Sequence, residues 1–363
     1  MKKEKILISG NEAIGEGAIQ AGCFFYAGYP ITPQNELTAY MAKRMLQEKR
    51  IFIQAESEVS AINMVLGASS CGFRAMTSSS SPGISLKQEG ISYLAACQLP
   101  AVIVNIMRAG PGLGNVFPAQ SDYFQATKGG GHGDYHSIVL APSNIQEAFD
   151  FMFLAFDLAD KYRNPVMILG DGILGQMMEP LRLSVVSGQL SDRYNLKTKN
   201  RKLKAKSWAL TGCKKRSPHI IRSLYLKQKE IEELNLLLQK KYKTIKQKES
   251  RWQEVDIEDA KVIMVAYGTM ARIAKGVVKK LREKNKKIGL IRPITLWPFP
   301  QRVFERICQR RIIFLVIEMS YGQMLEDVKL AVEGRAKVEF LGRGGGGIPK
   351  EQEILHKIES LKI

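Results

Sequence analysis

Three polar side chains that are suited to acid–base and anion-binding chemistry each follow a short apolar run. Thr32 stands in Tyr29-Pro30-Ile31-Thr32-Pro33, Glu58 ends Ala55-Glu56-Ser57-Glu58, and Arg108 follows the apolar run at 101–107. A hydroxyl, a carboxyl and a guanidinium thus occur where strands are expected to end. Because open α/β sheets bind ligands beyond the carboxyl ends of their strands, we predict that these side chains contribute to a ligand site.

Each of the three residues also has a structural interpretation. Proline favours the first position of a helix, so Thr32 could cap a helix that starts at Pro33. Glu58 could be a solvated carboxylate favoured by the dipole at a helix start, and Glu56 competes with it. Arg108 could be a surface arginine at a strand end, although its planar fork suits a carboxylate. The residues alone leave these alternatives open.

The order of apolar segments predicts an α/β fold with a doubly wound parallel sheet. The 363 residues suggest about two domains, and a hydrophobic content of 45% is typical of globular proteins. The predicted strands are 6–9, 24–29, 51–54, 75–78, 101–107 and 166–169, then 262–266, 287–291, 312–317 and 338–341. The predicted helices are 12–21, 33–48, 58–70, 86–96 and 144–161, then 270–284, 300–310 and 322–334. We predict a first domain at 1–255, with a core at 1–182 and a basic extension at 183–255, and a smaller α/β domain at 256–363.

The net charge of +19 is concentrated in one segment. Residues 181–251 hold 20 Lys and Arg against 5 Asp and Glu, so the rest of the chain contributes only +4. Such a segment could bind nucleic acid, an acidic protein or phosphates, or it could be a solvated face or a linker. Apolar residues at near-helical spacing between 226 and 252 favour an amphipathic helix with a basic outer face. Few aromatic residues interleave with the lysines, and we predict no nucleic-acid partner.

Several other classes of site are not indicated. The five cysteines form no C-x-x-C pair, which argues against zinc or an iron–sulfur cluster in this chain and favours isolated buried thiols. His132 and His136 have helical spacing, but the glycines around them make a helix improbable. No apolar run reaches the roughly 18 residues of a membrane span, and the N-terminus lacks the features of a signal peptide. We therefore predict a cytoplasmic protein without membrane contact.

The motifs resemble those of the alpha-type subunit of the 2-oxoacid:ferredoxin oxidoreductases, which use thiamine diphosphate, and most of all the 2-oxoisovalerate branch. Y-P-I-T-P at 29–33 matches the family motif letter for letter, and Ser57-Glu58 matches its S-E. The arginine motif R-x-G-P continues with Gly112 where many relatives carry Ser, and the T-S-S-S loop at 77–85 has Ser81 in place of a Gly. Four later segments resemble the family's transketolase-C-like second domain, namely 266–269, 292–300, 318–324 and 342–347.

The resemblance implies a role for each motif. Glu58 would bond to N1′ of the aminopyrimidine of thiamine diphosphate, in a low-dielectric pocket that lets the carboxyl share a proton. Thr32 and Arg108 would anchor the carboxylate of the substrate. The neighbouring residues are assigned to the same ligands, with substrate contacts for Tyr29 and Ile31 and a cofactor contact for Pro30.

A further motif, Gly170-Asp171-Gly172, copies the opening of a Mg²⁺–diphosphate site. That site also needs an Asn about two dozen residues later, and Asn195 lies in the basic segment. We therefore predict an ordinary strand-end turn and no metal ligands in this chain. By the resemblance, a beta-type subunit would hold Mg²⁺ and the diphosphate. A ferredoxin-like subunit would hold the iron–sulfur clusters, and a gamma-type subunit is a further candidate partner.

The predicted function is the CoA-dependent oxidative decarboxylation of a branched-chain 2-oxoacid to acyl-CoA and CO2, with reduction of ferredoxin, by a multi-subunit complex. One alternative is the same type of complex acting on 2-oxoglutarate or pyruvate. A less favoured alternative is a basic nucleic-acid- or protein-binding protein without enzymatic activity. A self-contained transketolase-like enzyme would need the complete diphosphate motif.

Overall fold

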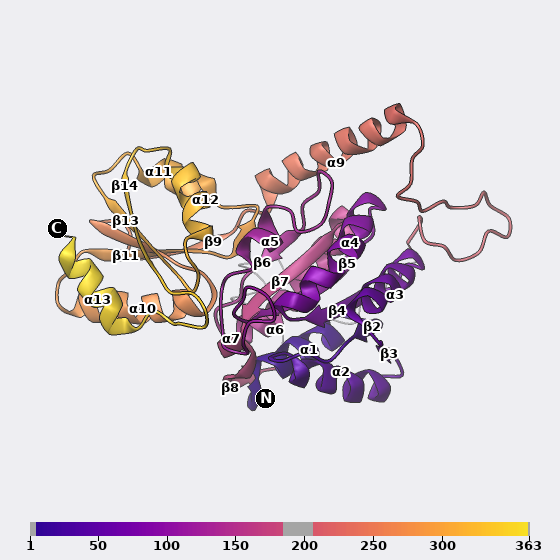
Figure 1. Ribbon diagram of the computed structural model, residues 1–363, viewed down its shortest axis with the longest axis horizontal. Helices are drawn as coiled ribbons and strands as arrows, with labels where there is room; N and C mark the ends of the chain where they lie inside the picture. The colour runs from indigo at the N-terminus through magenta and orange to yellow at the C-terminus, as the bar shows by residue number, and fades with distance from the viewer. Residues whose placement is uncertain (1–4, 184–205, 362–363) are drawn as a thin grey trace.

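The computed structural model describes residues 5–183 and 206–361 and contains two α/β units built on separate sheets (Figure 1). The larger sheet has seven strands in the order β12-β6-β7-β5-β4-β2-β3. Its strands are β2 (Phe25–Gly28), β3 (Ile51–Gln54), β4 (Ala75–Ser79), β5 (Ala101–Met107), β6 (Ile138–Leu140), β7 (Pro165–Asp171) and β12 (Thr295–Trp297). All pairs are parallel except that of β12 with β6. The predicted parallel α/β architecture is confirmed.

Helices cover both faces of the larger sheet (Figure 1). The first group is α1 (Gly10–Gln20), α2 (Asn35–Gln47) and α6 (Ile145–Tyr162), and the second is α3 (Glu58–Ser70) and α4 (Ser81–Ala96). Helix α1 packs against α2 and α6, and α3 packs against α4. Because parallel crossovers are right-handed, the strand order itself requires α2 and α6 on the face opposite α3 and α4.

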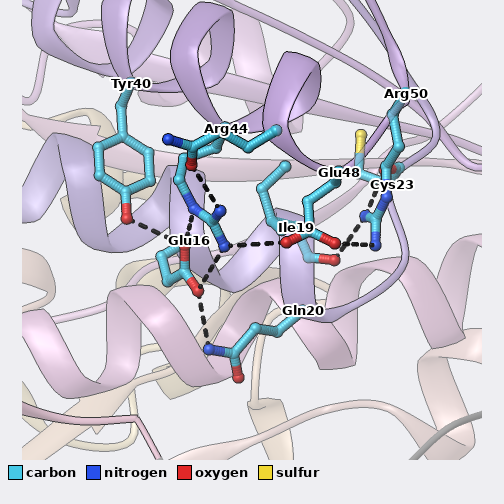
Figure 2. Close-up of polar contacts among 9 residues, drawn as sticks. Glu16, Ile19, Gln20, Cys23, Tyr40, Arg44, Glu48 and Arg50 are labelled. Atoms are coloured by element: carbon cyan, nitrogen blue, oxygen red, sulfur yellow. Dashed lines mark hydrogen bonds and ion pairs between the residues drawn. The ribbon is translucent and has the colours of Figure 1, made fainter.

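Helices α1 and α2 are joined by a polar network around Glu16 (Figure 2). Arg44 Nε and Tyr40 Oη each donate to Glu16 Oε2 at 2.9 Å, and Gln20 Nε2 donates to Oε1 at 2.9 Å. Burial raises the pKa of Glu16, but the bonds from Arg44, Gln20 and Tyr40 more than offset it, so the pKa is lowered overall. The network fixes α2, and with it the segment that leads from β2 into α2.

The N-terminal strand is present as predicted, but it lies outside the large parallel sheet. Strand β1 (Lys5–Ser9) forms where a strand is expected, but it pairs antiparallel with β8 (Met178–Arg182) in a separate two-stranded sheet. Its partly exposed residues suit such an edge position rather than the buried parallel sheet. The sequence analysis also missed β6, because three buried residues give no readable periodicity.

The smaller sheet has five strands in the order β14-β13-β10-β11-β9. They are β9 (Trp252–Val255), β10 (Val262–Val265), β11 (Ile288–Pro293), β13 (Ile313–Glu318) and β14 (Lys337–Gly342). The associated helices are α10 (Gly268–Glu283), α11 (Gln301–Ile307), α12 (Gln323–Val332) and α13 (Glu351–Ser360). The four predicted strands are present and parallel, and β9 adds an antiparallel edge.

The two units share strands and buried hydrogen bonds. Strand β9 precedes the predicted boundary at 255 but lies in the smaller sheet, whereas β12 follows the boundary and completes the larger sheet. Gln120 joins the units, since its side chain donates to Tyr267 O at 3.0 Å and accepts from Met319 N at 3.0 Å. The division of the chain at 255 stays a prediction.

The predicted amphipathic helix of the basic segment is present as α9 (Gln228–Lys248), which runs along the outside of the molecule (Figure 1). Leu234, Leu238, Tyr242 and Ile245 form its buried face, whereas the predicted apolar position Leu237 is 51% exposed. Residues 184–205 of the segment lie outside the described residues.

The lengths of the helices and the state of the cysteines bear on two of the predictions. None of the described helices is long and apolar enough to cross a membrane. All five cysteines are free thiols, and the expectation that they are buried holds for Cys23 and Cys308 but is wrong for Cys71 and Cys213, which are exposed.

Candidate active site

The predicted site residues gather where the winding of the larger sheet reverses. Strands β2 and β4 are neighbours, but they pair only at Phe25 with Ala75 and Tyr26 with Met76, near the start of each strand. The helices that follow them, α2 and α4, lie on opposite faces. The ends of β2 and β4 therefore flank a topological switch point, where doubly wound sheets bind their ligands.

Two hydrogen bonds from Gln34 close the turn after β2 before helix α2 begins. Gln34 N donates to Ile31 O at 3.0 Å, and the side chain of Gln34 donates to Tyr29 O at 3.3 Å. Helix α2 starts at Asn35, with no side-chain cap, so the predicted start at Pro33 and the capping alternative for Thr32 are wrong. Instead, Thr32 Oγ1 accepts a hydrogen bond from Asn35 Nδ2 at 3.2 Å. Its own proton is therefore left for another acceptor.

The residues on either side of Thr32 differ in their exposure. Tyr29 and Pro30 are exposed, whereas Ile31 and Thr32 are half-buried. Pro33 is buried, and its carbonyl accepts from Asn11 Nδ2 at 2.8 Å. The turn is thus anchored at its end and open to a ligand at its start.

A buried hydroxyl network supports this turn from below. Tyr26 Oη lies 2.6 Å from Ser78 Oγ and 3.0 Å from Thr38 Oγ1, and Ser78 Oγ donates to Gln34 Oε1 at 2.7 Å. Burial raises the pKa of Tyr26 to about 12, and the phenol stays neutral. The network joins β2, β4 and the start of α2.

Glu58, the first residue of α3, is the buried carboxyl of the site. Ser57 caps the helix by accepting from Ser60 N at 3.2 Å, which fixes Glu58 at its first position. The side chain of Glu58 is only 6% exposed, and its carboxylate accepts no hydrogen bond from the described residues. Glu56 is exposed and bonded to Ser60, so the geometry favours Glu58 over Glu56.

Gly83 forms the wall that faces the Glu58 carboxylate. A Cβ atom at Gly83 would lie 2.4 Å from Glu58 Oε1 and 2.1 Å from Ser79 Oγ, so no larger residue fits without a shift. The hydroxyls of Thr77, Ser79 and Ser80 at the end of β4 are buried without a hydrogen-bond partner. The sequence analysis assigned no chemistry to this loop, although its match to the family motif was a usable signal. It lies directly against Glu58.

Arg108 is buried and does not fit the alternative of a surface arginine. Its exposed fraction is 7%, and its guanidinium donates to Thr32 O at 3.0 Å and to Leu113 O at 3.1 Å. Its Nε–H group is buried and has no acceptor within residues 5–183 and 206–361. Since a guanidinium carries five N–H donors, three remain for a ligand after these two bonds. The structure thus brings Arg108 and Thr32 together.

Three polar residues to which the sequence analysis gave no role hold the end of β5 against the start of α4. Asn105 accepts from Ser81 N at 3.1 Å and donates to Asp122 Oδ2 at 2.9 Å. Ser81 Oγ accepts from Arg108 N at 2.9 Å and lies 2.6 Å from Asp122 Oδ2. Burial raises the pKa of Asp122, although the bonds from Ser81 and Asn105 oppose the shift. These contacts set the position of Arg108 relative to Gly83.

Asp171 has a structural role. Its Oδ1 accepts from Ile173 N at 3.0 Å and Leu174 N at 3.1 Å, which caps the short helix α7 (Gly172–Gln176), and from Thr269 Oγ1 at 2.9 Å. The residue is 1% exposed, and burial raises the pKa of its carboxyl. The predicted turn at 170–172 is wrong, because Gly170 and Asp171 end β7 and Gly172 directly begins α7. Asn195 lies outside the described residues.

The donor and acceptor set fits one half of thiamine diphosphate. A free buried carboxylate at Glu58, a side-chain-free wall at Gly83 and the orphaned hydroxyl of Ser79 suit a polar heteroaromatic ring. A magnesium diphosphate needs several oxygen ligands, and the described residues contain no group of three His, Cys, Asp or Glu side chains placed to hold a metal. The residues therefore fit the pyrimidine end and not the diphosphate end.

A doubly wound sheet with this site at its switch point defines a pyrimidine-binding chain of the thiamine-diphosphate class. Residues 16–248 match the family "Pyruvate flavodoxin/ferredoxin oxidoreductase, thiamine diP-bdg", and residues 260–354 match "Pyruvate:ferredoxin oxidoreductase core domain II". The chain belongs to the 2-oxoacid:ferredoxin oxidoreductase family, as the sequence motifs predicted.

Two relatives match this chain over almost its full length. The chain is 47% identical over 355 residues to ketoisovalerate oxidoreductase subunit VorB of Methanothermobacter marburgensis, covering 98% of this chain and 97% of the relative. It is 36% identical over 379 residues to 2-oxoglutarate synthase subunit KorA of Methanothermobacter thermautotrophicus, covering 98% of each. The sequence similarity thus includes both units.

Solved structures of low sequence identity share the fold. A 2-oxoglutarate:ferredoxin oxidoreductase from Magnetococcus marinus superposes with a TM-score of 0.87 at 24% identity, over 99% of this chain and 65% of that one. A split-gene transketolase superposes with a TM-score of 0.57 at 12% identity, over 97% of each chain. The succession of the two α/β units is therefore shared with these proteins.

Proposed function

We propose that this chain is the pyrimidine-binding subunit of a complex that oxidatively decarboxylates a branched-chain 2-oxoacid to acyl-CoA and CO2 and reduces ferredoxin. The choice of substrate is supported by the 47% identity to a ketoisovalerate oxidoreductase subunit, against 36% to a 2-oxoglutarate synthase subunit. The observation that carries the mechanism is the buried Glu58 carboxylate, which faces Gly83 and accepts no hydrogen bond from the part of the chain that the structure describes.

In this proposal Glu58 holds a proton at N1′ of the pyrimidine. Thiamine diphosphate, when bound, supplies the electron sink for cleavage of the bond to the substrate carboxylate. A carboxylate without a hydrogen-bond donor among the described residues is available to bond to a ring nitrogen, and its burial strengthens that bond. Pro30, in the turn at the switch point, is proposed to contact the same ring.

Arg108 and Thr32 are proposed to bind the carboxylate of the substrate. The buried Nε–H of Arg108 has no partner, and the Thr32 hydroxyl keeps its proton because it accepts from Asn35. A guanidinium paired with a carboxylate forms strong, directional bonds. Tyr29 and Ile31 flank Thr32 and are proposed to contact the rest of the substrate.

The remaining parts of the reaction are assigned to partners. Since Asp171 is committed to Thr269 and the start of α7, we propose that a beta-type subunit holds Mg²⁺ and the diphosphate. Iron–sulfur clusters are assigned to a ferredoxin-like subunit, and a gamma-type subunit is a further candidate. The basic segment is proposed to attract anionic partners such as CoA and ferredoxin rather than nucleic acid. A cytoplasmic location remains a prediction.

Proton exchange at C2 of thiamine in the assembled complex tests the role of Glu58. We expect Glu58→Gln to fold normally and to slow exchange about 10²–10⁴-fold, because the amide keeps the volume but cannot share a proton. Glu56→Gln, two residues away and exposed, is the matched control and should exchange at the wild-type rate. Exchange at the wild-type rate in Glu58→Gln would overturn the proposal.

A further inference from the structure

A lysine with no part in the proposed reaction is fully buried beside Glu58. Lys87 lies in α4 and has an exposed fraction of 0%. Lysines are almost never fully buried unless they are paired. In the described chain, Lys87 Nζ donates one hydrogen bond, to the main-chain oxygen of Glu58 at 3.4 Å.

The position of Lys87 follows from the packing of α4 on α3. Gly83, Lys87 and Gly90 lie at i, i+4 and i+7 and share one face of α4. A Cβ at Gly83 would meet the Glu58 carboxylate, and a Cβ at Gly90 would lie 2.6 Å from Ile62. The same face of α4 thus contacts the first two turns of α3, with Lys87 between the two glycines.

The electrostatics couple Lys87 to Glu58. Burial lowers the pKa of Lys87 to about 8, and the Glu58 carboxylate opposes that shift. Glu58 is the charged group of the described chain that acts on Lys87. The remaining acid of this part of α4, Glu89, is directed to Tyr93. A methionine of the same length would fill the space without the cost of burying an ammonium group.

We propose that Lys87 is a positioning residue for Glu58. Its ammonium group holds the first residue of α3 in place through the bond to the main-chain oxygen of Glu58, and it places a positive charge near the carboxylate that is proposed to bond to the pyrimidine. The inference rests on the proposed function, since it assigns a supporting residue to the same site.

A half-buried lysine, Lys241, supplies the control. Lys241 in α9 donates to Arg163 O at 3.2 Å, and burial lowers its pKa to about 8 as well. It has the same chemistry as Lys87 but packs on another part of the molecule. Lys87→Met and Lys241→Met therefore remove equivalent groups, of which only the first contacts Glu58.

The experiment compares both variants in the assembled complex by thermal melting, by thiamine diphosphate affinity and by the pH dependence of C2 proton exchange. We expect Lys87→Met to move the acidic limb of the exchange profile upward by about one pH unit, because the carboxylate loses a nearby opposite charge. We also expect it to weaken cofactor binding. Lys241→Met should show neither effect, and in a Glu58→Gln background Lys87→Met should change neither the exchange profile nor the cofactor affinity any further.

The outcomes separate this inference from the proposed function. If Lys87→Met lowers the melting temperature but leaves the acidic limb and the cofactor affinity at wild-type values, Lys87 is only structural and the inference is wrong. If Glu58→Gln exchanges normally, the proposed function itself fails. Should Lys87→Met not assemble, Lys87→Gln keeps a polar donor without the charge and must show the same displaced limb.

Discussion

The guanidinium of Arg108 connects two loops of the proposed site. Its bonds to Thr32 O and Leu113 O tie the turn after β2 to the loop after β5. The orphaned Nε–H faces no partner in the described chain. A lysine would keep the charge of Arg108 but would offer neither the fork nor the second anchoring bond.

We therefore expect Arg108→Lys to raise the KM for the 2-oxoacid more than it lowers the affinity for thiamine diphosphate. The loss of a bidentate contact costs about 1–3 kcal/mol, or roughly 5- to 150-fold in KM. Steady-state kinetics and cofactor titration of the reconstituted complex measure the two effects. Arg44→Lys, which affects the α1–α2 network instead, is the control for general loss of stability. A fall in cofactor affinity with an unchanged KM would show that Arg108 contacts a different ligand.

At the scale of the element, the first turn of α4 is defined by the lack of a side chain at Gly83. There is no room for a methyl group at Gly83, since Ser79 Oγ and Glu58 Oε1 both lie within 2.5 Å of the position that a Cβ atom would take. Both are side-chain atoms, so an alanine at this position would displace them even though helix propensity favours alanine over glycine.

We expect Gly83→Ala to abolish cofactor-dependent activity by displacing the Glu58 carboxylate. Gly67→Ala in α3 is a matched control, because nothing lies within 4 Å of its Cβ position. That control should stabilise the chain by roughly 0.5–1 kcal/mol, as expected for glycine in an exposed helix interior. Thermal melting and C2 exchange of both variants measure the effects. Full exchange activity in Gly83→Ala would contradict the described packing.

Helix α6 carries a buried acid whose ionisation opposes folding. Asp150 is 2% exposed, its Oδ2 has no hydrogen-bond partner, and Gln146 donates to Oδ1 at 3.2 Å. Burial raises its pKa to about 7, Gln146 opposes the shift, and Glu147 adds to it. Since the pKa of this acid is raised on folding, its contribution to stability is fully present below about pH 4 and is lost as the pH rises through about 7.

Asp150→Asn removes this dependence because an amide does not ionise. The melting temperature of the variant relative to wild type should therefore rise between about pH 5 and about pH 8. Differential scanning calorimetry at both values is the measurement. If the melting temperatures of variant and wild type differ by the same amount at both pH values, the Asp150 carboxyl does not titrate in this range.

For the molecule as a whole, the important expectation is that the described chain supplies only the pyrimidine half of the proposed cofactor site. The pyrimidine end has Glu58, whereas the acid at the end of β7, Asp171, is bonded to the second unit. Metal coordination and charged hydrogen bonds to a diphosphate outweigh one bond between a carboxyl and a pyrimidine. The affinity for the cofactor should thus depend on the assembled complex.

We expect the isolated chain to be catalytically silent and to bind thiamine diphosphate weakly or not at all. Titration calorimetry with Mg²⁺ and cofactor, first on the chain alone and then with its partner subunit, is the measurement. Micromolar binding by the chain alone would mean that a diphosphate site lies within it, and the proposed division between subunits would be wrong. The same titration on Asp171→Asn would then show whether the diphosphate site includes Asp171.

The sequence by itself determined the local elements and the chemical character of the site. Helix α3 at Glu58–Ser70 and strand β5 at Ala101–Met107 match the prediction to the residue, because a Ser N-cap and a continuous apolar run mark their ends. The Y-P-I-T-P, Ser57-Glu58 and arginine motifs indicated the family. These signals are local, since each depends on residues within a few positions of one another.

Only the tertiary structure decided which of these residues meet. Arg108 contacts Thr32 across 76 residues, Lys87 contacts Glu58 across 29, and Thr269 contacts Asp171 across 98. Such contacts depend on the order of strands in the sheet and on the exchange of β9 and β12 between the two units. Hydrophobic periodicity shows which face of an element is buried, but not which neighbour it is buried against. The hydrogen bond between Thr269 and Asp171 and the burial of Lys87 beside Glu58 were therefore visible only in the folded chain.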